Sequence, residues 1–465
     1  MSAPGFVVVG RVNKGKSSIV ATLAEEESIP ISDEPGTTRE TRAYSVEVEG
    51  NVLFTLKDTP GFQDAPAALE EIRKQRRDAS VSDAAVKSFV DTYRNSREFQ
   101  EETRLLAPIL DGGRILYVVD GTVPYSGDYE AEMEILRWTG RPRMALINRI
   151  GAADHAAEWR RALGQFFGIV RDFDANKAGF ADRIRLLESF RELDDGAREA
   201  LDRAIEVLKT EHRRRRREAS RSIAGLLAGA LTQRHELKLE KHERAEDRLE
   251  EAREKLRKDL AERERKAHAE IFALYRFRRL RPSELPVAGL TEDLFAEKTW
   301  KVLGLTHGQL LAGGAAMGAG LGLAIDAATV GHTFGLAALL GGAIGFGSAL
   351  VRSGRTLGSE WRVVKHLIDG ERVVRYGPLG RDNLPWILLD RALIYFRAVS
   401  TRAHSAQGEL AVTDQDAVVR GLPAGIRTSG SRLFSRIAKQ GAELPDDLGS
   451  ELRAWVEQRL EALDR

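Results

Sequence analysis

Near the start of the chain, eight consecutive residues form a complete phosphate-binding pattern. Residues 10–17, GRVNKGKS, match G-x-x-x-x-G-K-S/T at each fixed position, directly after the apolar run FVVV and before a helical stretch. In this pattern, backbone N–H groups of the loop and of the helix N-terminus converge on phosphate oxygens. Lys16 is expected to neutralise charge on the β- and γ-phosphates, and Ser17 to ligate Mg²⁺. The chemistry implied is the binding of a nucleoside triphosphate.

A second polar motif follows the next apolar stretch. Asp58-Thr59-Pro60-Gly61 ends residues 51–61, NVLFTLKDTPG. Phosphate-coupled switches need a carboxylate here to hold the water shell of Mg²⁺, and a glycine N–H near the γ-phosphate. Between the two motifs lies Pro35-Gly36-Thr37-Thr38-Arg39, where a threonine hydroxyl would complete the magnesium shell only when the γ-phosphate is present. That dependence is the usual basis of a nucleotide switch.

Six apolar runs in the first 180 residues are expected to form the sheet that positions these motifs. Continuous β-branched runs are typical of a parallel sheet covered by helices on both faces. Residues 41–50 alternate instead and end at a turn, which indicates an antiparallel edge strand in a hairpin. The polar stretch between Gly61 and Arg114 is helical in pattern, so we expect an insertion there. The expected strands are 6–10, 41–50, 51–58, 114–120, 143–148 and 168–174.

The motifs GRVNKGKSS, PGTTRE, DTPGF and VVDGT resemble those of the G domain in the Era, EngA and MnmE group of bacterial GTPases. This resemblance covers residues 5–180. It implies an α/β P-loop NTPase G domain with a mostly parallel sheet, which binds GTP and GDP, hydrolyses GTP and uses Mg²⁺. The whole layout also resembles a less characterised bacterial family, in which such a G domain precedes a helical domain of unknown function.

The resemblance implies roles residue by residue. Thr38 matches the switch I threonine that ligates Mg²⁺, Asp58 and Gly61 match the switch II pair, and Lys16, Thr38 and Gly61 take the catalytic roles. Asn13 matches an asparagine that helps to hold K⁺ beside the phosphates in potassium-stimulated members. The implied Mg²⁺ ligands are Ser17, Thr38 and Asp58, and the implied nucleotide-binding residues are Gly10, Asn13, Lys14, Gly15, Lys16, Ser17, Ser18, Asp58, Asn148, Arg149, Ala175 and Asn176.

Phe62 follows the pattern of that group, in which a hydrophobic residue replaces the water-orienting glutamine, whereas the guanine motif departs from it. Phe62 stands where Ras-like proteins have a water-orienting glutamine, so catalysis would need a cation, a homodimer partner bound through the G domain, or another residue. The guanine motif N-K-x-D appears as Asn148-Arg149-Ile150-Gly151, without the aspartate that accepts two guanine donors. A site built around such hydrogen bonds discriminates strongly, so its loss should weaken the selection of guanine. Asp154 lies three residues later, and residues 174–176 would form the last base loop.

The rest of the chain is too long to share one core with the G domain, and its composition changes along its length. We expect a G domain over 1–185, a long helical or stalk region over 190–298, a glycine-rich apolar hairpin over 299–352 and a helical region over 353–465. Apolar residues at 245, 249, 252, 256 and 260 lie close to heptad spacing, which predicts one or two long helices. The predicted fold class is an α/β G domain followed by an all-α half.

The segment 299–352 is glycine-rich and apolar. Between Lys301 and Arg352 the one formally charged residue is Asp326, and glycines recur at four-residue spacing, which lets another helix approach closely. Its two apolar runs approach the length that spans a bilayer, and basic residues flank both ends. The alternative is a hairpin buried in a soluble domain, because Gly and Ala make the runs only modestly hydrophobic. The segment therefore predicts either contact with membrane lipids or a buried core.

Charge and composition exclude some classes of protein and leave others open. The formal net charge is +1, so no global field favours nucleic acid. The absence of cysteine excludes disulfides, thiolate metal sites and cysteine nucleophiles, and fits a reducing cytoplasm. The N-terminus lacks the pattern of a secretion signal. Arginine clusters at Arg213–Arg217 and Arg276–Arg281 suit anionic lipid, RNA or a solvated helix face.

The sequence thus predicts a Mg²⁺-dependent GTP-binding protein and GTPase that acts as a switch. We expect it to be cytoplasmic and to associate with the inner membrane through 299–352, with K⁺ as an additional candidate cofactor. Two alternatives stay open: an Era-like GTPase associated with RNA or the ribosome, and a nucleotide-binding scaffold that hydrolyses little.

Overall fold

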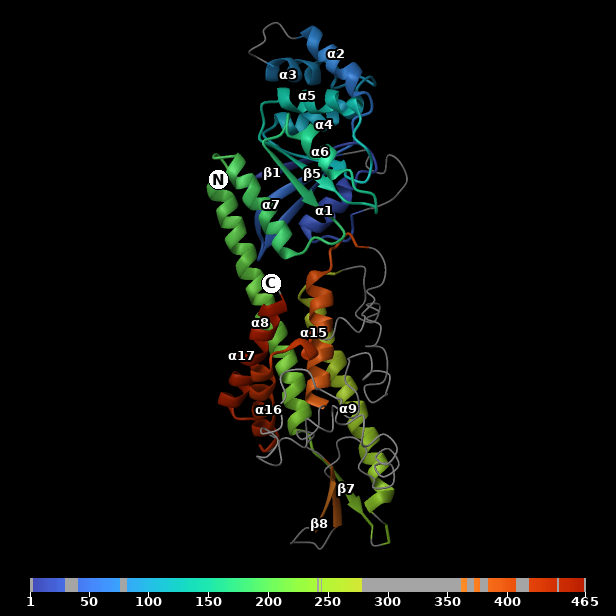
Figure 1. The fold of residues 1–465 in the computed structure, drawn as a ribbon, viewed down its shortest axis with the longest axis vertical. Coiled ribbons are helices and arrows are strands. Elements are labelled where there is room, and N and C mark those ends of the chain that lie inside the picture. Colours follow the sequence, from blue (N-terminus) through green and yellow to red (C-terminus); the bar gives the residue numbers. More distant parts are fainter. Residues whose placement is uncertain are drawn as a thin grey trace, which may run out of the picture. The chain divides into compact units, whose positions relative to one another are not determined.

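The computed structural model describes most of the chain as helices and strands (Figure 1). The described residues are 3–29, 41–75, 82–240, 242–243, 245–277, 361–365, 372–376, 384–406, 418–440 and 443–463. The switch I threonines Thr37 and Thr38 and the glycine-rich segment 299–352 lie outside them, as do residues 278–281 of the second arginine cluster. Within the described residues the chain divides into two compact units, the first formed by 3–214, 276–277 and 400–406 and the second by the rest.

A six-stranded sheet forms the centre of the first unit, in the order β2-β3-β1-β4-β5-β6. β1 pairs in parallel with β3 and β4, the pairs β4–β5 and β5–β6 are also parallel, and β2 is antiparallel to β3. The predicted parallel sheet with an antiparallel edge strand is therefore confirmed. The strands are β1 (Gly5–Val9), β2 (Arg42–Val48), β3 (Asn51–Asp58), β4 (Arg114–Asp120), β5 (Arg143–Asn148) and β6 (Ile169–Phe173).

Helices cover both faces of this sheet, because alternate residues of its central strands point to opposite sides. In β1, Phe6 and Val8 belong to a core shared with α1, α7 and the start of α8, whereas Val7 and Val9 belong to a core shared with α2 to α6. These four side chains are 0–2% exposed, which explains why the strand reads as one continuous apolar run. The helices on the first face are α1 (Lys16–Ala24), α7 (Phe180–Leu193) and α8 (Arg198–Thr232).

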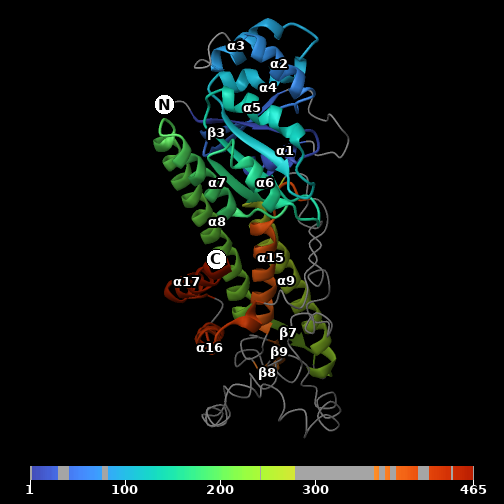
Figure 2. The same cartoon turned by 45° about the horizontal axis from the view of Figure 1, so that its top comes forward.

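The polar stretch after β3 folds into three helices, as predicted (Figure 2). They pack on one another and on α5, and their core includes Ile72 and Phe89, which are both fully buried. This helical layer begins only four residues after Gly61, so it adjoins the second phosphate motif directly. The helices on this face are α2 (Ala65–Gln75), α3 (Ser82–Tyr93), α4 (Gln100–Leu110), α5 (Glu130–Trp138), which follows the short helix η1 (Gly127–Tyr129), and α6 (Ala156–Leu163).

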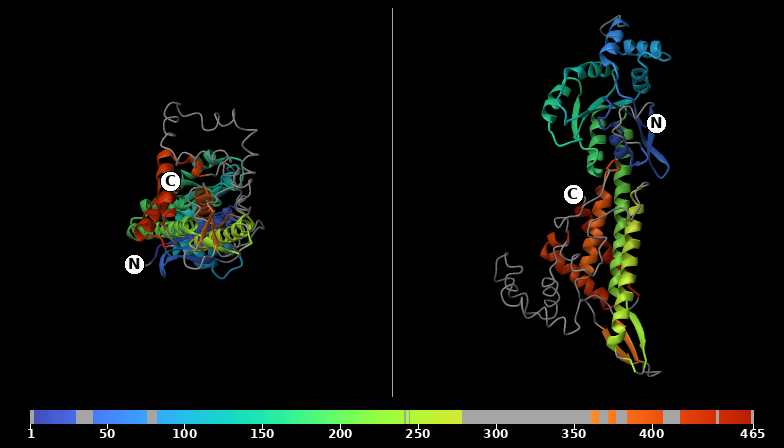
Figure 3. Two further views of the ribbon diagram at one scale, coloured as in Figure 1. Left: turned by 90° about the horizontal axis from the view of Figure 1, so that it is seen from below. Right: turned by 90° about the vertical axis from the view of Figure 1, so that its right-hand side faces the viewer.

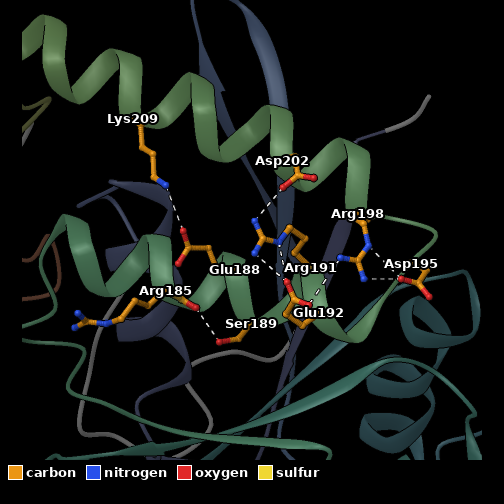
Figure 4. A network of polar contacts seen from close by, with 9 residues as sticks. All are labelled: Arg185, Glu188, Ser189, Arg191, Glu192, Asp195, Arg198, Asp202 and Lys209. Atoms are coloured by element: carbon orange, nitrogen blue, oxygen red, sulfur yellow. Dashed lines mark hydrogen bonds and ion pairs between the residues drawn. The ribbon is translucent and has the colours of Figure 1, made fainter.

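Charged side chains join α7 to the start of α8, a helix of 35 residues (Figure 4). Arg191 of α7 pairs with Asp202 at 3.1 Å, and Lys209 of α8 pairs with Glu188 at 3.3 Å. Exposed pairs of this kind contribute little individually. Apolar contact holds the first turns of α8 on the sheet instead, since Leu201 is fully buried in the same core as β1.

Long helices form the body of the second unit: the later part of α8, α9 (Ala245–Ala273) and α15 (Leu384–Thr401) (Figure 3). The long helices predicted within 190–298 are therefore confirmed. An ion pair between Arg391 and Glu264 joins α15 to α9 at 2.6 Å, with both residues at most 6% exposed. The remaining helices of this unit are η4 (Val419–Gly421), α16 (Ala424–Ala438) and α17 (Asp446–Leu463).

The second unit also contains a small sheet, which the sequence analysis did not predict. The strands β7 (His235–Leu239), β9 (Arg372–Tyr376) and β8 (Trp361–Lys365) pair in the antiparallel order β7-β9-β8. The predicted all-helical second half is thus largely helical in its described part, with this sheet as an addition. No helix among the described residues combines the length and the apolar character needed to cross a bilayer.

Candidate functional site

The phosphate loop lies between β1 and α1, at the carboxyl ends of the parallel strands, where sheets of this kind bind ligands. Three of its residues have positive φ: Gly10 (143°), Asn13 (60°) and Gly15 (81°). A Cβ on Gly10 would lie 2.3 Å from the carbonyl oxygen of Val118, and one on Gly15 would lie 2.1 Å from Nδ2 of Asn148. Close approach and backbone conformation therefore both require the two glycines of the motif.

Lys16 is the buried cation of this loop. Its side chain crosses the loop, and Nζ donates a hydrogen bond to the carbonyl oxygen of Arg11 at 2.9 Å. Burial lowers the pKa of Lys16 to about 8, and the nearby carboxylates of Asp58 and Glu132 oppose that shift. A bound polyphosphate would add negative charge beside the ammonium group and raise its pKa. Lys16 is thus placed to gain a charge-assisted partner when phosphate binds.

Ser17 and Asp58 meet next to Lys16, as the two motifs predict. The hydroxyl of Ser17 donates to Oδ2 of Asp58 at 2.7 Å, which brings the first motif and the second motif together. Both residues offer oxygen, the donor that Mg²⁺ prefers. The residues present therefore fit a magnesium ion held through Ser17 and the Asp58 carboxylate. Within the described part of the chain, no cluster of three or more His, Asp or Glu residues provides a separate metal site.

Gly61 packs directly against the phosphate loop. A Cβ at this position would lie 2.9 Å from the carbonyl oxygen of Gly10 and 3.0 Å from the amide nitrogen of Val12. Any larger residue would push the second motif away from the loop. Phe62, the next residue, is 6% exposed and belongs to the core shared with α2 to α5. The position that holds a water-orienting glutamine in Ras-like proteins is therefore part of the apolar core here.

Glu102 of α4 anchors the segment that follows Gly61. Its Oε1 accepts hydrogen bonds from the backbone amides of Gln63 at 2.8 Å and Asp64 at 2.9 Å, and the residue is 2% exposed. A backbone carbonyl two residues along α4, at Arg104, accepts from the hydroxyl of Thr41 at 3.2 Å. The helical insertion thus contacts the second motif and the residue that precedes β2. The sequence analysis did not identify Glu102.

A second carboxylate, Glu132 of α5, holds the phosphate loop from the other side. It pairs with the guanidinium of Arg11 and accepts a hydrogen bond from the hydroxyl of Tyr117 at 2.9 Å. Arg11 also lies over the ring of Tyr129, 3.7 Å from its centroid. Burial raises the pKa of Glu132, against the opposing effect of Arg11 and Tyr117. These contacts fix the second position of the loop, where the phosphate-binding pattern allows any residue.

The base side of the site is built around Asn148, at the end of β5. Its Oδ1 accepts from the amide of Ala175 at 3.2 Å, and its Nδ2 donates to the carbonyl of Lys14 at 3.2 Å. Asn148 therefore joins the phosphate loop to the predicted last base loop, and it is 2% exposed. Lys14 in turn pairs with Asp120 at 3.5 Å. Asn176 follows Ala175 in the base loop and is exposed.

The remainder of the guanine motif is open to solvent. Arg149, Ile150 and Gly151 are exposed, and Nη2 of Arg149 lies 3.5 Å from Oδ2 of Asp154. The other oxygen of Asp154 accepts from the amide of Ala156 at the start of α6. Both carboxylate oxygens of Asp154 therefore already have partners, one at the start of α6 and the other in Arg149. The aspartate missing at position 151 has no evident replacement among these contacts.

The structure brings together most of the predicted site residues. Gly10, Asn13, Lys14, Gly15, Lys16, Ser17 and Ser18 form one loop, which Asp58 and Gly61 contact from the second motif and Asn148 from the base side. Thr38 lies outside the described residues. Glu102 carried one signal in the sequence, because it is a carboxylate on the apolar face of α4, three and four residues before the buried Leu105 and Leu106.

Family models match the chain in two parts. Residues 160–460, more than half of the chain, match the family described as "Domain of unknown function (DUF3482)". The chain belongs to this family. Residues 6–149 match the family described as "50S ribosome-binding GTPase". The N-terminal part is a GTPase domain homologous to MnmE and Der, as its motifs predicted, and the DUF3482 domain follows it.

The curated relatives share the first part of the chain. The tRNA modification GTPase MnmE of Oceanobacillus iheyensis is 24% identical over 204 residues, 43% of this chain and 42% of that protein. MnmE of Chromohalobacter salexigens is 31% identical over 214 residues, 44% and 42% of the two chains. GTPase Der of Prochlorococcus marinus is 28% identical over 191 residues, 40% and 35%. The chain thus spans about two fifths of the length of these relatives.

Among solved structures, the chain is similar to Era. A crystal structure of an Aquifex aeolicus Era variant bound to GDP.AlF4- shares 16% identity with it, at a TM-score of 0.29, covering 56% of this chain and 89% of that chain. A structure of Era in complex with MgGDPNP and a part of 16S ribosomal RNA gives the same TM-score.

Proposed function

We propose that this DUF3482-family protein is a Mg²⁺-dependent GTPase that acts as a nucleotide switch. One observation carries the proposal: Ser17 of the phosphate loop is bonded to Asp58 of the second motif, while Gly61 lies against the backbone of the same loop. A γ-phosphate bound in the loop would therefore be sensed by both motifs at once. That is the arrangement through which a triphosphate and a diphosphate can produce different conformations.

The hydrolysis expected of this site relies on positioning and charge stabilisation. Phosphoryl transfer passes through a loose transition state, so the protein mainly aligns the phosphates and neutralises their charge. Lys16 would stabilise negative charge on the phosphates, and Gly61 would orient the γ-phosphate. Magnesium held by Ser17, Asp58 and Thr38 would supply further charge neutralisation. Because Phe62 is buried, the attacking water must be oriented by another group.

The proposal names two sources for the group that orients the attacking water. Asn13 adopts a left-handed backbone conformation in the loop and is exposed, and it matches the asparagine that helps to hold K⁺ beside the phosphates in potassium-stimulated members of the group that the motifs resemble. A homodimer formed through the G domain is the alternative source of help. Hydrolysis that is at least several-fold faster in K⁺ than in Na⁺ supports the cation, and rates that rise with protein concentration support the dimer.

Calorimetric titration of the full chain with GTP, GDP and ATP, with Mg²⁺ and with excess EDTA, tests the proposal. We expect micromolar or tighter binding of GTP and GDP and weaker binding of GTP in EDTA. Turnover is then measured as released phosphate. Folded protein with no affinity for any nucleoside triphosphate would contradict the proposal. Binding without measurable turnover would instead favour a scaffold that hydrolyses little.

A second part of the proposal places the protein at the cytoplasmic face of the inner membrane, through lipid contact by 299–352. It is supported by the composition of that segment, in which Asp326 is the one formal charge between Lys301 and Arg352. Flotation with anionic vesicles tests it, using Leu321→Glu to place a charge in the first apolar run and Leu321→Ile as the matched control. Loss of flotation only in the Glu variant is expected. Full release of the wild-type protein from membranes by carbonate argues against insertion.

The RNA-associated alternative is less well supported by the arginine run in α8. Arg213 pairs with Glu206 at 2.7 Å and Arg214 pairs with Glu211 at 2.7 Å. Arg215 is 5% exposed. At least three of the five arginines are therefore engaged by the protein itself, which favours a structural role for this run.

A further inference from the structure

A segment from the far end of the chain contacts the base side of the site. Residues 400–406 comprise the last two residues of α15 and the turn that follows, and they belong to the same compact unit as the G domain. Within this segment Ser405 is 3% exposed, and its Oγ lies 2.7 Å from the carbonyl oxygen of Ala175 and 3.1 Å from Oδ1 of Asn176. Ser405 thus bonds the predicted base loop from 230 positions away in the sequence.

Thr22 completes this buried group of hydroxyls. It lies in α1, the helix that begins at Lys16, and is 2% exposed. Its Oγ1 is 2.8 Å from the carbonyl oxygen of Ala175 and 2.9 Å from Oγ of Ser405. Each hydroxyl carries one proton, so each donates to one of its two acceptors at a time, which gives four combinations. Thr22 donates either to Ala175 or to Ser405, and Ser405 donates either to Ala175 or to Asn176.

In three of the four combinations the Ala175 carbonyl accepts a hydrogen bond from Thr22 or Ser405. The amide of the same residue donates to Oδ1 of Asn148 at 3.2 Å, so both the amide and the carbonyl of Ala175 are hydrogen-bonded to other segments. Ala175 is 1% exposed, and an unsatisfied polar group buried at this point would cost more than an ordinary hydrogen bond contributes. The position of the base loop therefore depends on the two hydroxyls.

Neighbouring contacts order the segment that carries Ser405. The ring of His404 stacks on Phe277, with centroids 4.5 Å apart and an interplanar angle of 16°. Nη2 of Arg402 donates to the carbonyl of Ala406 at 3.1 Å, which closes a turn around Ser405. The chain runs into this turn directly from α15, whose residues up to Val399 belong to the second unit. The helix α15 is thus covalently continuous with a contact to the base loop.

We infer that Ser405 is a positioning residue of the nucleotide site: with Thr22 it holds the base loop at Ala175 and so slows the release of guanine nucleotide. The inference rests on the proposed function, because it needs a guanine nucleotide bound at this loop. It gives the second unit, through α15, a direct means of regulating nucleotide exchange. A partner that displaced residues 400–406 would accelerate exchange without touching the phosphate loop.

A double-mutant cycle on the full chain tests the inference, with the dissociation rate of a fluorescent GDP analogue as the readout. Ser405→Ala leaves Thr22 to satisfy Ala175, and Thr22→Val leaves Ser405 to do so, so each change should raise the rate only about two- to threefold. The double variant leaves the carbonyl without either donor. We expect its rate to rise about twentyfold or more, well above the product of the single effects.

Ser220→Ala is the matched control, because Ser220 is also buried, at 2% exposed, and donates to a backbone carbonyl, that of Arg217, at 2.7 Å. It should lower thermal stability without changing the GDP dissociation rate. A double variant that releases GDP at the wild-type rate, or at the product of the single rates, overturns the inference and leaves the GTPase proposal standing. A wild-type protein that binds no guanine nucleotide is a failure of the proposed function instead.

Discussion

The phosphate side and the base side of the nucleotide site are held in different ways. On the phosphate side, Lys16, Ser17, Asp58 and Gly61 follow two unbroken motifs, and their contacts bring the motifs together. On the base side the guanine motif is incomplete at Gly151, and Ser405 hydrogen-bonds to the last base loop at Ala175. The comparison indicates that affinity resides mainly in the phosphate contacts, and that selection and exchange depend on the rest of the chain.

The largest expected effect is on the phosphate side. Lys16→Ala removes the one buried cation of the loop, so GTP and GDP affinity should fall by about a hundredfold or more, since hydrogen bonds to charged groups contribute most. Calorimetry measures the loss. Lys14→Ala is the comparison in the same loop: Lys14 pairs with Asp120 at 3.5 Å, and its loss should weaken binding only several-fold. Near wild-type affinity in Lys16→Ala would refute the assignment of the phosphate loop.

The next effect separates binding from turnover. Glu102→Ala leaves the amides of Gln63 and Asp64 without their carboxylate acceptor, so the segment after Gly61 should lose its fixed position. We expect the rate of GTP hydrolysis to fall about tenfold, with little change in GDP affinity, because GDP lacks the γ-phosphate that Gly61 would contact. Glu102→Gln retains an acceptor oxygen and should be milder.

Glu101→Ala is the matched control for this change, as the adjacent acidic residue in the first turn of α4. It should leave both quantities close to wild type. If Glu102→Ala weakened GDP and GTP binding equally and left turnover unchanged, then α4 would support the fold without acting on the second motif.

A smaller effect on the phosphate side depends on pH. Burial lowers the pKa of Lys16 to about 8, and bound phosphate would raise it, so binding above pH 8 requires uptake of a proton. GDP affinity should therefore be nearly constant from pH 6.5 to 7.5 and fall by up to about tenfold per unit above pH 8. Calorimetry at pH 9 in two buffers of different ionisation enthalpy measures the proton taken up. Equal apparent enthalpies in the two buffers would contradict a shifted Lys16.

The phosphate side and the base side also differ in how well they could be predicted from the sequence. Continuous apolar runs, together with the alternation of residues 41–50, were enough to place all six strands of the first sheet within about two residues, because burial on both faces leaves a strong pattern in the central strands. The phosphate side could be predicted equally well, since its residues stand at fixed spacing within short motifs. The interior position of Glu102 was visible only as a carboxylate among apolar residues of a helix.

The contact made by Ser405 and the small sheet of the second unit could not be predicted, because each joins residues that are far apart in the sequence. Ser405 contacts Ala175 across 230 positions, and a single serine in a polar turn carries no periodic signal. The small sheet of the second unit pairs β7 with β9, whose sequences HELKL and RVVRY are short and rich in charge. β9 lacks hydrophobic alternation and β7 shows it over only five residues, and their pairing brings together segments more than a hundred residues apart.

The smallest expected effect concerns the selection of guanine on the base side. Gly151→Asp restores the aspartate of the guanine motif, and the backbone accepts it, because a Cβ there would meet only the side chain of Thr122, at 3.6–3.7 Å. We expect the preference for GTP over ITP, which lacks the exocyclic amino group, to rise about five- to tenfold. Gly151→Ala provides the same Cβ without the carboxylate and should leave the preference unchanged.

The two variants together decide what the missing aspartate means. A preference that rises only in Gly151→Asp would show that the loop after Asn148 already faces the base, so that the natural glycine relaxes selection without altering the architecture. Equal preferences in the Asp and Ala variants would place position 151 away from the base. In that case the base loop held by Ser405 and Thr22 would have to supply the contacts to guanine, and exchange and selection would both depend on the segment that follows α15.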